Sequence, residues 1–283
     1  MYADPNVKDG KVGYVTHMFN PGLHKLDLVS KSYKGFVNVS SHGCGGTFNL
    51  AYSSLNKHAF VQCFASRRPV ALLEMDLASD KIVKKWNITG APYASPDGRY
   101  IVILYKSINE TANLLLDSKV FVLFIADNNS LAVLKSKFDF PGGVSKLEFG
   151  KKNGEQGGYL AYISLLYSDK IAVMDLDLLD SYADKISYIE GVGSVFTAPG
   201  MHAVRRSLLR SGTWLVSPAT ANNSVAIINT STGKLHGMVM GVAGGRSLFA
   251  VDLSQRNGAA EKTCCSQETL IVILLFSLYK AIA

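Results

Sequence analysis

The chain has 283 residues, of which 48% are hydrophobic and 18% are charged. This composition supplies enough apolar side chains for a large buried core and excludes a disordered chain. The 29 Lys and Arg residues outnumber the 22 Asp and Glu residues only modestly, and they occur in scattered pairs such as Lys84-Lys85 and Arg205-Arg206. A nucleic-acid binder usually gathers its positive charge in one stripe, so we expect a solvated surface with at most weak attraction to anionic glycans or phospholipids.

The N-terminal residues 1–12 are polar and hold no apolar run of the kind that a signal peptide needs. We expect an N-terminal extension there, followed by a folded region over residues 13–253. If the protein is extracellular, this start indicates a fragment or a misassigned first residue.

Five segments of the folded region share one pattern, an apolar strand that ends at an acidic or polar turn residue. They alternate with period 2 and are rich in Val, Ile, Phe and Tyr, which favours strands over the helices of a solenoid. The turn residues recur at intervals of about 50 residues, the period of four-stranded β-propeller blades. These residues are Asp27, Asp76, Asp127, Asp175 and Asn229.

In chain order, the pattern predicts three strands within residues 13–38 and then four strands in each of four repeats. The Ser95-Pro96-Asp97-Gly98 sequence is typical of a tight turn before a strand. The expected strands of these repeats cover 48–53, 58–63, 70–77 and 81–88; 91–95, 100–105, 119–125 and 131–138; 146–150, 158–167, 170–176 and 185–191; and 203–209, 212–219, 224–230 and 234–241.

A further strand, over residues 247–253, follows the fifth repeat. We expect it to complete the first blade and close a ring of five blades, which would remove unpaired sheet edges. The alternative is that these are the last blades of a longer ring.

Asn-X-Ser/Thr sequences are more frequent than the roughly two or three that chance supplies, which indicates a secretory history and N-glycosylation. Most fall at expected strand ends or turns. They begin at Asn38, Asn87, Asn109, Asn128, Asn222 and Asn229.

Four strings resemble, in this order, successive pieces of the C-terminal region of the larger follistatin-like proteins, secreted members of the follistatin/SPARC-related group. They are GLHKLDL, LAYSSLNKHAFVQC, NITGAPYASPDGRYIV and MHAVRRSLLRSGTWLVSPA, and the resemblance covers roughly residues 10–252. Nothing in the chain resembles the family's Kazal module, EF-hands or immunoglobulin domains. The family's calcium binding is therefore not carried over, and we expect no cofactor.

Cys44 and Cys63 match positions where this family has cysteines, so the resemblance implies a disulfide between them. The alternative is two buried free thiols. A bridge would close a loop of about 20 residues, would stabilise the fold by roughly 3 kcal/mol, and requires a Cα separation below about 7 Å.

Residues of the kind that carry catalysis or bind metal are present but lack a known arrangement. The six histidines have no metal-ligand spacing, and no P-loop or G-x-S-x-G sequence occurs. The Asp175-Leu-Asp177-Leu-Leu-Asp180 stretch lacks the EF-hand glycine and third ligand, so we expect it to cap a turn. Trp86 and Trp214 are expected in the core. A charged blade face or part of a partner-binding rim is expected for His202, Arg205, Arg206 and Arg210.

The C-terminal end divides into a polar spacer over residues 254–269 and a hydrophobic tail over residues 270–283. Small residues, a spacer and a terminal apolar run are typical of a GPI-attachment signal, with Asn257 or Gly258 as the attachment residue. Lys280 weakens this reading, and the run is shorter than the about 20 residues of a spanning helix. The alternatives are a short membrane-associated helix or aberrant sequence from splicing or gene-model error.

These observations lead us to expect a secreted or cell-surface, non-catalytic protein-interaction module. The family resemblance implies signalling or matrix association, including modulation of growth factors of the TGF-β/BMP class, with a growth factor or receptor as partner. One alternative is a propeller enzyme of the lactonase or quinoprotein type, with ligands converging at the channel mouth. Another is an intracellular WD-type scaffold, which the glycosylation sequences and the missing repeat signature disfavour.

Overall fold

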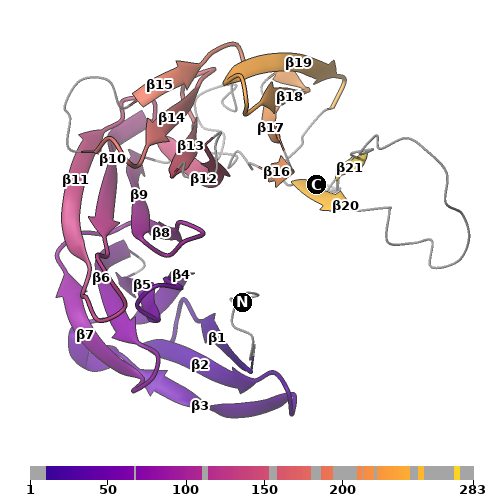
Figure 1. Ribbon diagram of the computed structural model, residues 1–283. Coiled ribbons are helices and arrows are strands. Elements are labelled where there is room, and N and C mark those ends of the chain that lie inside the picture. The colour runs from indigo at the N-terminus through magenta and orange to yellow at the C-terminus, as the bar shows by residue number, and fades with distance from the viewer. Residues whose placement is uncertain are drawn as a thin grey trace, which may run out of the picture. The chain divides into compact units, whose positions relative to one another are not determined.

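The computed structural model describes most of the predicted folded region and one short segment after it (Figure 1). The described residues form antiparallel strands and one 3-10 turn, η1 (Ser40–His42). They are residues 11–66, 68–109, 114–152, 158–179, 186–193, 209–211, 213–219, 222–242, 248–251 and 271–274.

The strands form one three-stranded sheet, four four-stranded sheets and one two-stranded sheet, and neighbours in each sheet are consecutive in the chain. The first sheet holds β1 (Val12–Thr16), β2 (Gly22–Asp27) and β3 (Ser32–Asn38), and the second holds β4 (Gly46–Tyr52), β5 (His58–Ala65), β6 (Arg68–Asp76) and β7 (Lys81–Trp86). The third holds β8 (Ala91–Ala94), β9 (Tyr100–Asn109), β10 (Leu114–Phe124) and β11 (Val133–Asp139).

The fourth sheet holds β12 (Val144–Lys151), β13 (Tyr159–Leu165), β14 (Ile171–Asp175) and β15 (Ile186–Ile189). The fifth holds β16 (Leu209–Ser211), β17 (Trp214–Ala219), β18 (Ser224–Asn229) and β19 (Lys234–Met240), and β20 (Leu248–Val251) pairs with β21 (Ile271–Leu274).

The all-β architecture with four-stranded repeats, predicted from the period of about 50 residues, is confirmed. One expectation differs from the structure, and another lies mostly outside the described residues. Of the strand expected over 203–209, only Leu209 is described, as part of β16, because residues 201–208 lie outside the described residues. The strand expected over 247–253 does not complete the first sheet, because β20 pairs with the apolar β21 instead.

The recurring Asp or Asn at the end of a repeat closes the hairpin between the last two strands of its sheet. Its side-chain oxygen accepts backbone N–H bonds from residues two or three positions later, for example from Val29 and Ser30 to Asp27 at 3.0 and 2.9 Å. Such side-chain caps substitute for a backbone turn bond and explain why Asp and Asn are favoured there. The other caps lie at Asp76, Asp127, Asp175 and Asn229.

The chain divides into two compact units. The first comprises residues 1–107 and 117–141, and the second comprises residues 108–116 and 142–283. Each has its own core between sheets. In the first unit, Leu23 and Tyr14 pack with Val61, Leu73 and other side chains of the β4–β7 sheet. In the second unit, the core includes Tyr162, Ile171, Leu215 and Ile228.

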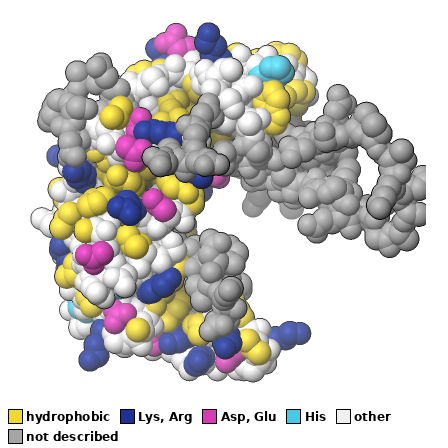
Figure 2. Space-filling model, viewed as in Figure 1, with side chains coloured by type: hydrophobic (Ala, Val, Ile, Leu, Met, Phe, Trp, Pro, Cys, Tyr) yellow, Lys and Arg dark blue, Asp and Glu magenta, His cyan; other side chains and the backbone are white. Residues whose placement is uncertain are grey.

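In the part of the chain that the structure describes, no helix is long and apolar enough to span a membrane. On the face seen in Figure 2, Lys and Arg side chains lie among Asp and Glu side chains and do not gather in one stripe, which matches the scattered pairs in the sequence.

Candidate protein-interaction surface

The first sheet is held against the second by a polar contact at the β6–β7 turn. Asp80 accepts hydrogen bonds from the Tyr14 hydroxyl at 2.7 Å and from the Lys25 ammonium at 2.6 Å. Tyr14 and Lys25 are cross-strand neighbours on β1 and β2, so one carboxylate fixes both strands. Burial raises the pKa of Tyr14, and the bond to Asp80 raises it further, which keeps the phenol protonated as a donor.

A second polar contact joins the β4–β7 sheet to the β8–β11 sheet within the same unit. The Glu74 carboxylate is fully buried and accepts bonds from Ala132 N at 3.1 Å and from the Trp86 indole at 3.3 Å. It also lies 2.9 Å from His58 Nδ1, and the Lys84 ammonium donates to Ala132 O at 3.0 Å. Buried carboxylates persist only when they are hydrogen-bonded in this way, so the role of these residues is to hold the two sheets together.

A disulfide adds a covalent link near these contacts. Cys44, which follows η1, is bonded to Cys63 on β5, with a Cα separation of 5.3 Å, as the family resemblance implied. Both cysteines are buried in the cluster that contains Tyr14 and Leu23. The bridge therefore ties the connection between the first two sheets to the second sheet, and a closed loop of this size stabilises by about 3 kcal/mol.

The opposite face of the first sheet carries aromatic and histidine side chains. Residues of β2 alternate between faces, so His24 points away from the core residue Leu23 and from Lys25. The His24 ring lies 5.1 Å from the Phe36 ring, 5.9 Å from the Tyr33 ring and 6.0 Å from the His17 ring. We call His17, Phe19, His24, Tyr33 and Phe36 the aromatic patch.

The aromatic patch is open to solvent. Phe19 is 70% exposed, Tyr33 is 60% exposed and Phe36 is 37% exposed. Phe19 lies in the loop after His17, whose Nδ1 accepts its backbone N–H at 3.2 Å, so the loop is held beside the sheet. Exposed aromatic side chains that cluster in this way are typical of protein-interaction surfaces.

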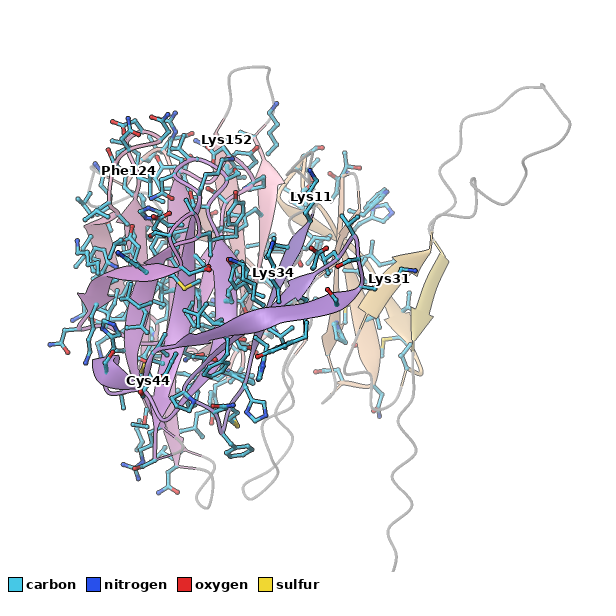
Figure 3. All side chains as sticks on the ribbon, turned by 90° about the horizontal axis from the view of Figure 1, so that it is seen from below. Lys11, Lys31, Lys34, Cys44, Phe124 and Lys152 are labelled. Atoms are coloured by element: carbon cyan, nitrogen blue, oxygen red, sulfur yellow. A yellow bond between two sulfur atoms is a disulfide. The ribbon has the colours of Figure 1, made fainter. Side chains whose placement is uncertain are left out.

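Three lysines are exposed on or next to the strands of the first sheet. Lys11 precedes β1, Lys31 lies in the β2–β3 turn and Lys34 lies on β3, and all three are exposed (Figure 3). Asp27 is the only acidic residue in this stretch of sequence, and its carboxylate is engaged in capping the turn. The first sheet therefore carries exposed aromatic rings and exposed lysines.

Among the sites expected from sequence, the glycosylation asparagines lie where a glycan is tolerated. Five are exposed: Asn38, Asn87, Asn109, Asn128 and Asn222. Asn229 is half-buried, and its side-chain oxygen caps the β18–β19 turn. Their modification stays a prediction. The expected lipid-attachment residues Asn257 and Gly258 lie outside the described residues.

The remaining expectations divide between the core, the surface and the part of the chain outside the described residues. Trp86 packs in the core beside Glu74, as predicted, whereas Trp214 is half-buried with its ring 4.8 Å from the His236 ring.

Asp175 caps its turn, as predicted, and also binds Lys152 at 2.5 Å. The expected rim residues His202, Arg205 and Arg206 lie outside the described residues. Within the described residues, no three His, Cys, Asp or Glu side chains are grouped so as to hold a metal ion.

Sequence reasoning missed the aromatic patch. The signal that points to it is apolar and aromatic residues on both faces of the first sheet, since Leu23 and Val37 alternate with His24 and Phe36. A sheet with one solvated face would carry polar residues there. The pattern was interpretable only once the strands had been paired.

No protein-family model matches the chain. Solved structures share its fold. The dihydro-heme d1 dehydrogenase NirN, in complex with DHE, matches with a TM-score of 0.57 at 15% identity over 85% of this chain and 48% of that chain. Hydrazine synthase of Kuenenia stuttgartiensis matches with a TM-score of 0.54 at 11% identity, over 94% and 81%.

The C-terminal WD40 domain of Sif2 matches with a TM-score of 0.53 at 12% identity, over 86% of this chain and 57% of that chain. This chain therefore spans about half the length of the NirN and Sif2 chains that it matches. At these identities the likeness shows the fold alone, and it confirms the β-propeller class predicted from the repeat.

Proposed function

We propose that this chain is a non-catalytic, extracellular protein-interaction module that binds its partner through the aromatic patch. The observation that carries the proposal is the exposed ring cluster on a sheet whose opposite face is fixed by the Asp80 contacts and the disulfide. Rigid exposed aromatic side chains provide large contact areas at a small cost in side-chain entropy.

Two features support an extracellular location. The Cys44–Cys63 disulfide is buried, and such bonds persist in oxidising compartments. The glycosylation sequences begin at exposed or half-buried asparagines, as modification in the secretory pathway requires. A secreted or cell-surface protein fits both features.

The chemistry of the patch points to an acidic partner. Lys11, Lys31 and Lys34 are exposed on or next to the strands of the same sheet, so a protein surface that combines carboxylates with an apolar anchor would complement it. A growth factor or receptor of the TGF-β/BMP signalling class is the partner that the follistatin-like resemblance implies, and it belongs to this proposal.

The proposal is tested by surface plasmon resonance with the glycosylated chain and a panel of TGF-β/BMP-class growth factors and their receptor ectodomains. We expect specific binding to at least one of them, which the Phe19→Ser and Tyr33→Ser variants each weaken by about tenfold or more. Both side chains are exposed, so these substitutions leave stability nearly unchanged. Lys34→Glu should lower the association rate and its dependence on salt.

The matched control is Val83→Ser, which removes a similarly exposed apolar side chain (41%) on β7, outside the aromatic patch. This variant should bind as the wild type does. The proposal is overturned if no member of the panel binds, or if the patch variants bind as tightly as the control.

A further inference from the structure

The second unit contains a cavity of about 350 Å³ between the β12–β15 sheet and the β18–β19 turn. Its floor is formed by Leu160 and Tyr162 on β13 and by Val173 on β14. The turn residues 230–233 form the facing wall, and the Tyr162 hydroxyl reaches the Thr230 carbonyl at 3.4 Å. The volume lies at the lower end of the range of about 300–1,000 Å³ for small-molecule sites.

The cavity occupies the position that corresponds, in the first unit, to the polar contacts between neighbouring sheets. The residue two positions before the capping Asp is Lys25 on β2, Glu74 on β6 and Val173 on β14. The Lys25 ammonium donates to Asp80 in the last turn of the next sheet. The Glu74 carboxylate likewise accepts from Ala132 N in the β10–β11 connection of the sheet that follows its own. Val173 is too short and has no polar atom, so the space before the β18–β19 turn stays open.

The charged groups that line the cavity are Lys151, Lys152 and Asp175, and Asp177 contacts Lys152 from outside the lining. The Lys152 ammonium, which is labelled in Figure 3, binds Asp175 Oδ1 at 2.5 Å and Asp177 Oδ2 at 2.8 Å. Burial lowers the pKa of Lys152, but its bonds to these two carboxylates outweigh burial and leave the pKa raised. Two carboxylates therefore neutralise the Lys152 ammonium, so it does not present an unpaired charge to a ligand.

Hydroxyl and apolar groups complete the lining. The turn supplies Thr230, Ser231 and Thr232, and Ser187 on β15 lies directly across from Val173. Leu160, Val173 and Leu178 provide an apolar wall. A ligand that fits must offer hydroxyl groups on one side and C–H groups on the other, without a net charge.

We propose that this cavity is a binding site for one ring of a neutral saccharide. Sugar hydroxyls donate to the Asp175 carboxylate and to the oxygens of the turn hydroxyls, and they accept from the Lys152 ammonium, while the C–H face of the ring contacts Leu160 and Val173. Charge-assisted hydrogen bonds of this kind discriminate strongly for hydroxyl groups.

The saccharide has two sources, and both have the same chemistry. One is a glycan of a partner. The other is an N-glycan of this chain at Asn229, which lies at the start of the turn that forms the cavity wall. Asn229→Asp separates them, because it removes the glycosylation sequence and keeps the capping oxygen that Asp provides at the other four turns.

The test is saturation-transfer difference NMR of the full chain with the methyl glycosides of mannose, galactose and glucose. We expect signals from at least one glycoside. Ser187→Trp places a large ring over the cavity from an exposed position and should weaken binding about tenfold or more. Lys152→Met should weaken it about tenfold to a hundredfold, because it removes a charged donor.

The matched control is Tyr188→Trp, the neighbouring residue on the opposite face of β15, which should leave binding unchanged. If the glycosylated wild type binds only after glycan trimming, while Asn229→Asp binds directly, the chain's own glycan is the occupant. If both bind directly, the occupant is a partner's glycan.

The inference is overturned if no glycoside gives a signal that Ser187→Trp removes, or if only sulfated or phosphorylated sugars bind. Since the aromatic patch lies in the other unit, this result is independent of the partner-binding experiment.

Discussion

One backbone position in the hairpin turns stores strain in some repeats and not in others. Four residues after the capping residue, Lys31 and Asp80 both have φ of 55°, and Gly233 has φ of 65°. A left-handed conformation costs a non-glycine residue roughly 1–2 kcal/mol, whereas glycine adopts it freely. The hydrogen bonds from Tyr14 and Lys25 to Asp80 offset this cost at Asp80. Lys31, in contrast, is exposed in its turn.

Exchanging residue types at this position should therefore move stability in opposite directions. Lys31→Gly should raise the free energy of unfolding by about 0.5 kcal/mol, which is the relieved strain less the added chain entropy of glycine. Gly233→Ala should lower it by about 1 kcal/mol, and the effect is purely conformational because a Cβ there meets nothing within 4 Å. Urea unfolding measures both changes, and a neutral Gly233→Ala would contradict the argument.

At the scale of the elements, the packing of the second sheet on the third depends on one buried carboxylate. Glu74→Ala leaves Trp86 Nε1 and Ala132 N without their acceptor in a buried site. We expect a loss of about 3 kcal/mol, because unsatisfied buried donors bear their full desolvation penalty.

Glu74→Gln is the informative comparison, since its amide oxygen keeps one acceptor while the charge is lost. It should cost less than Glu74→Ala. Chemical denaturation gives both values, and hydrogen exchange at Ala132 reports the local loss of protection. Equal effects of the two substitutions would show that the carboxylate's bonds are not what holds the sheets.

The strands were predictable because local rules govern them. Alternation placed the ends of β5 and β6 to within two residues, and the Asp or Asn caps set the period, since the same turn chemistry recurs at Asp76 and Asn229. The pairing of β20 with β21 was not predictable, because the alternation within one strand does not say which segment pairs with it.

Neither candidate surface was predictable, because each depends on what a neighbouring sheet supplies. Val173 looks like any strand valine in the sequence, and its lack of a polar end matters only because Lys25 and Glu74 occupy the corresponding positions elsewhere. Similarly, Phe36 is ordinary strand sequence until the pairing with His24 places it on the solvent face.

At the scale of the whole molecule, each capping Asp contributes to how the free energy of unfolding depends on pH, and these contributions add up over the repeats. The pKa of Asp127 is lowered by a backbone bond from Asn129, that of Asp27 by one from Ser30, and that of Asp76 by the Ser79 hydroxyl. Each carboxylate thus binds its proton less readily in the folded chain than in the unfolded chain. The stability that they confer is present above the ordinary Asp pKa and is lost as the pH falls through the lowered value.

The free energy of unfolding should therefore decrease as the pH falls below about 5, and replacing the three carboxylates should reduce this slope. The triple variant Asp27→Asn, Asp76→Asn and Asp127→Asn is suited to the test, because Asn229 already makes the same bonds to Ser231 and Thr232 through an amide oxygen. The variant should fold, and its stability should depend less on pH in the acid range. Urea unfolding at a series of pH values measures the slope, which reports the difference in bound protons between the two states. An unchanged slope would contradict the argument, because it would mean that the capping carboxylates do not set the acid sensitivity.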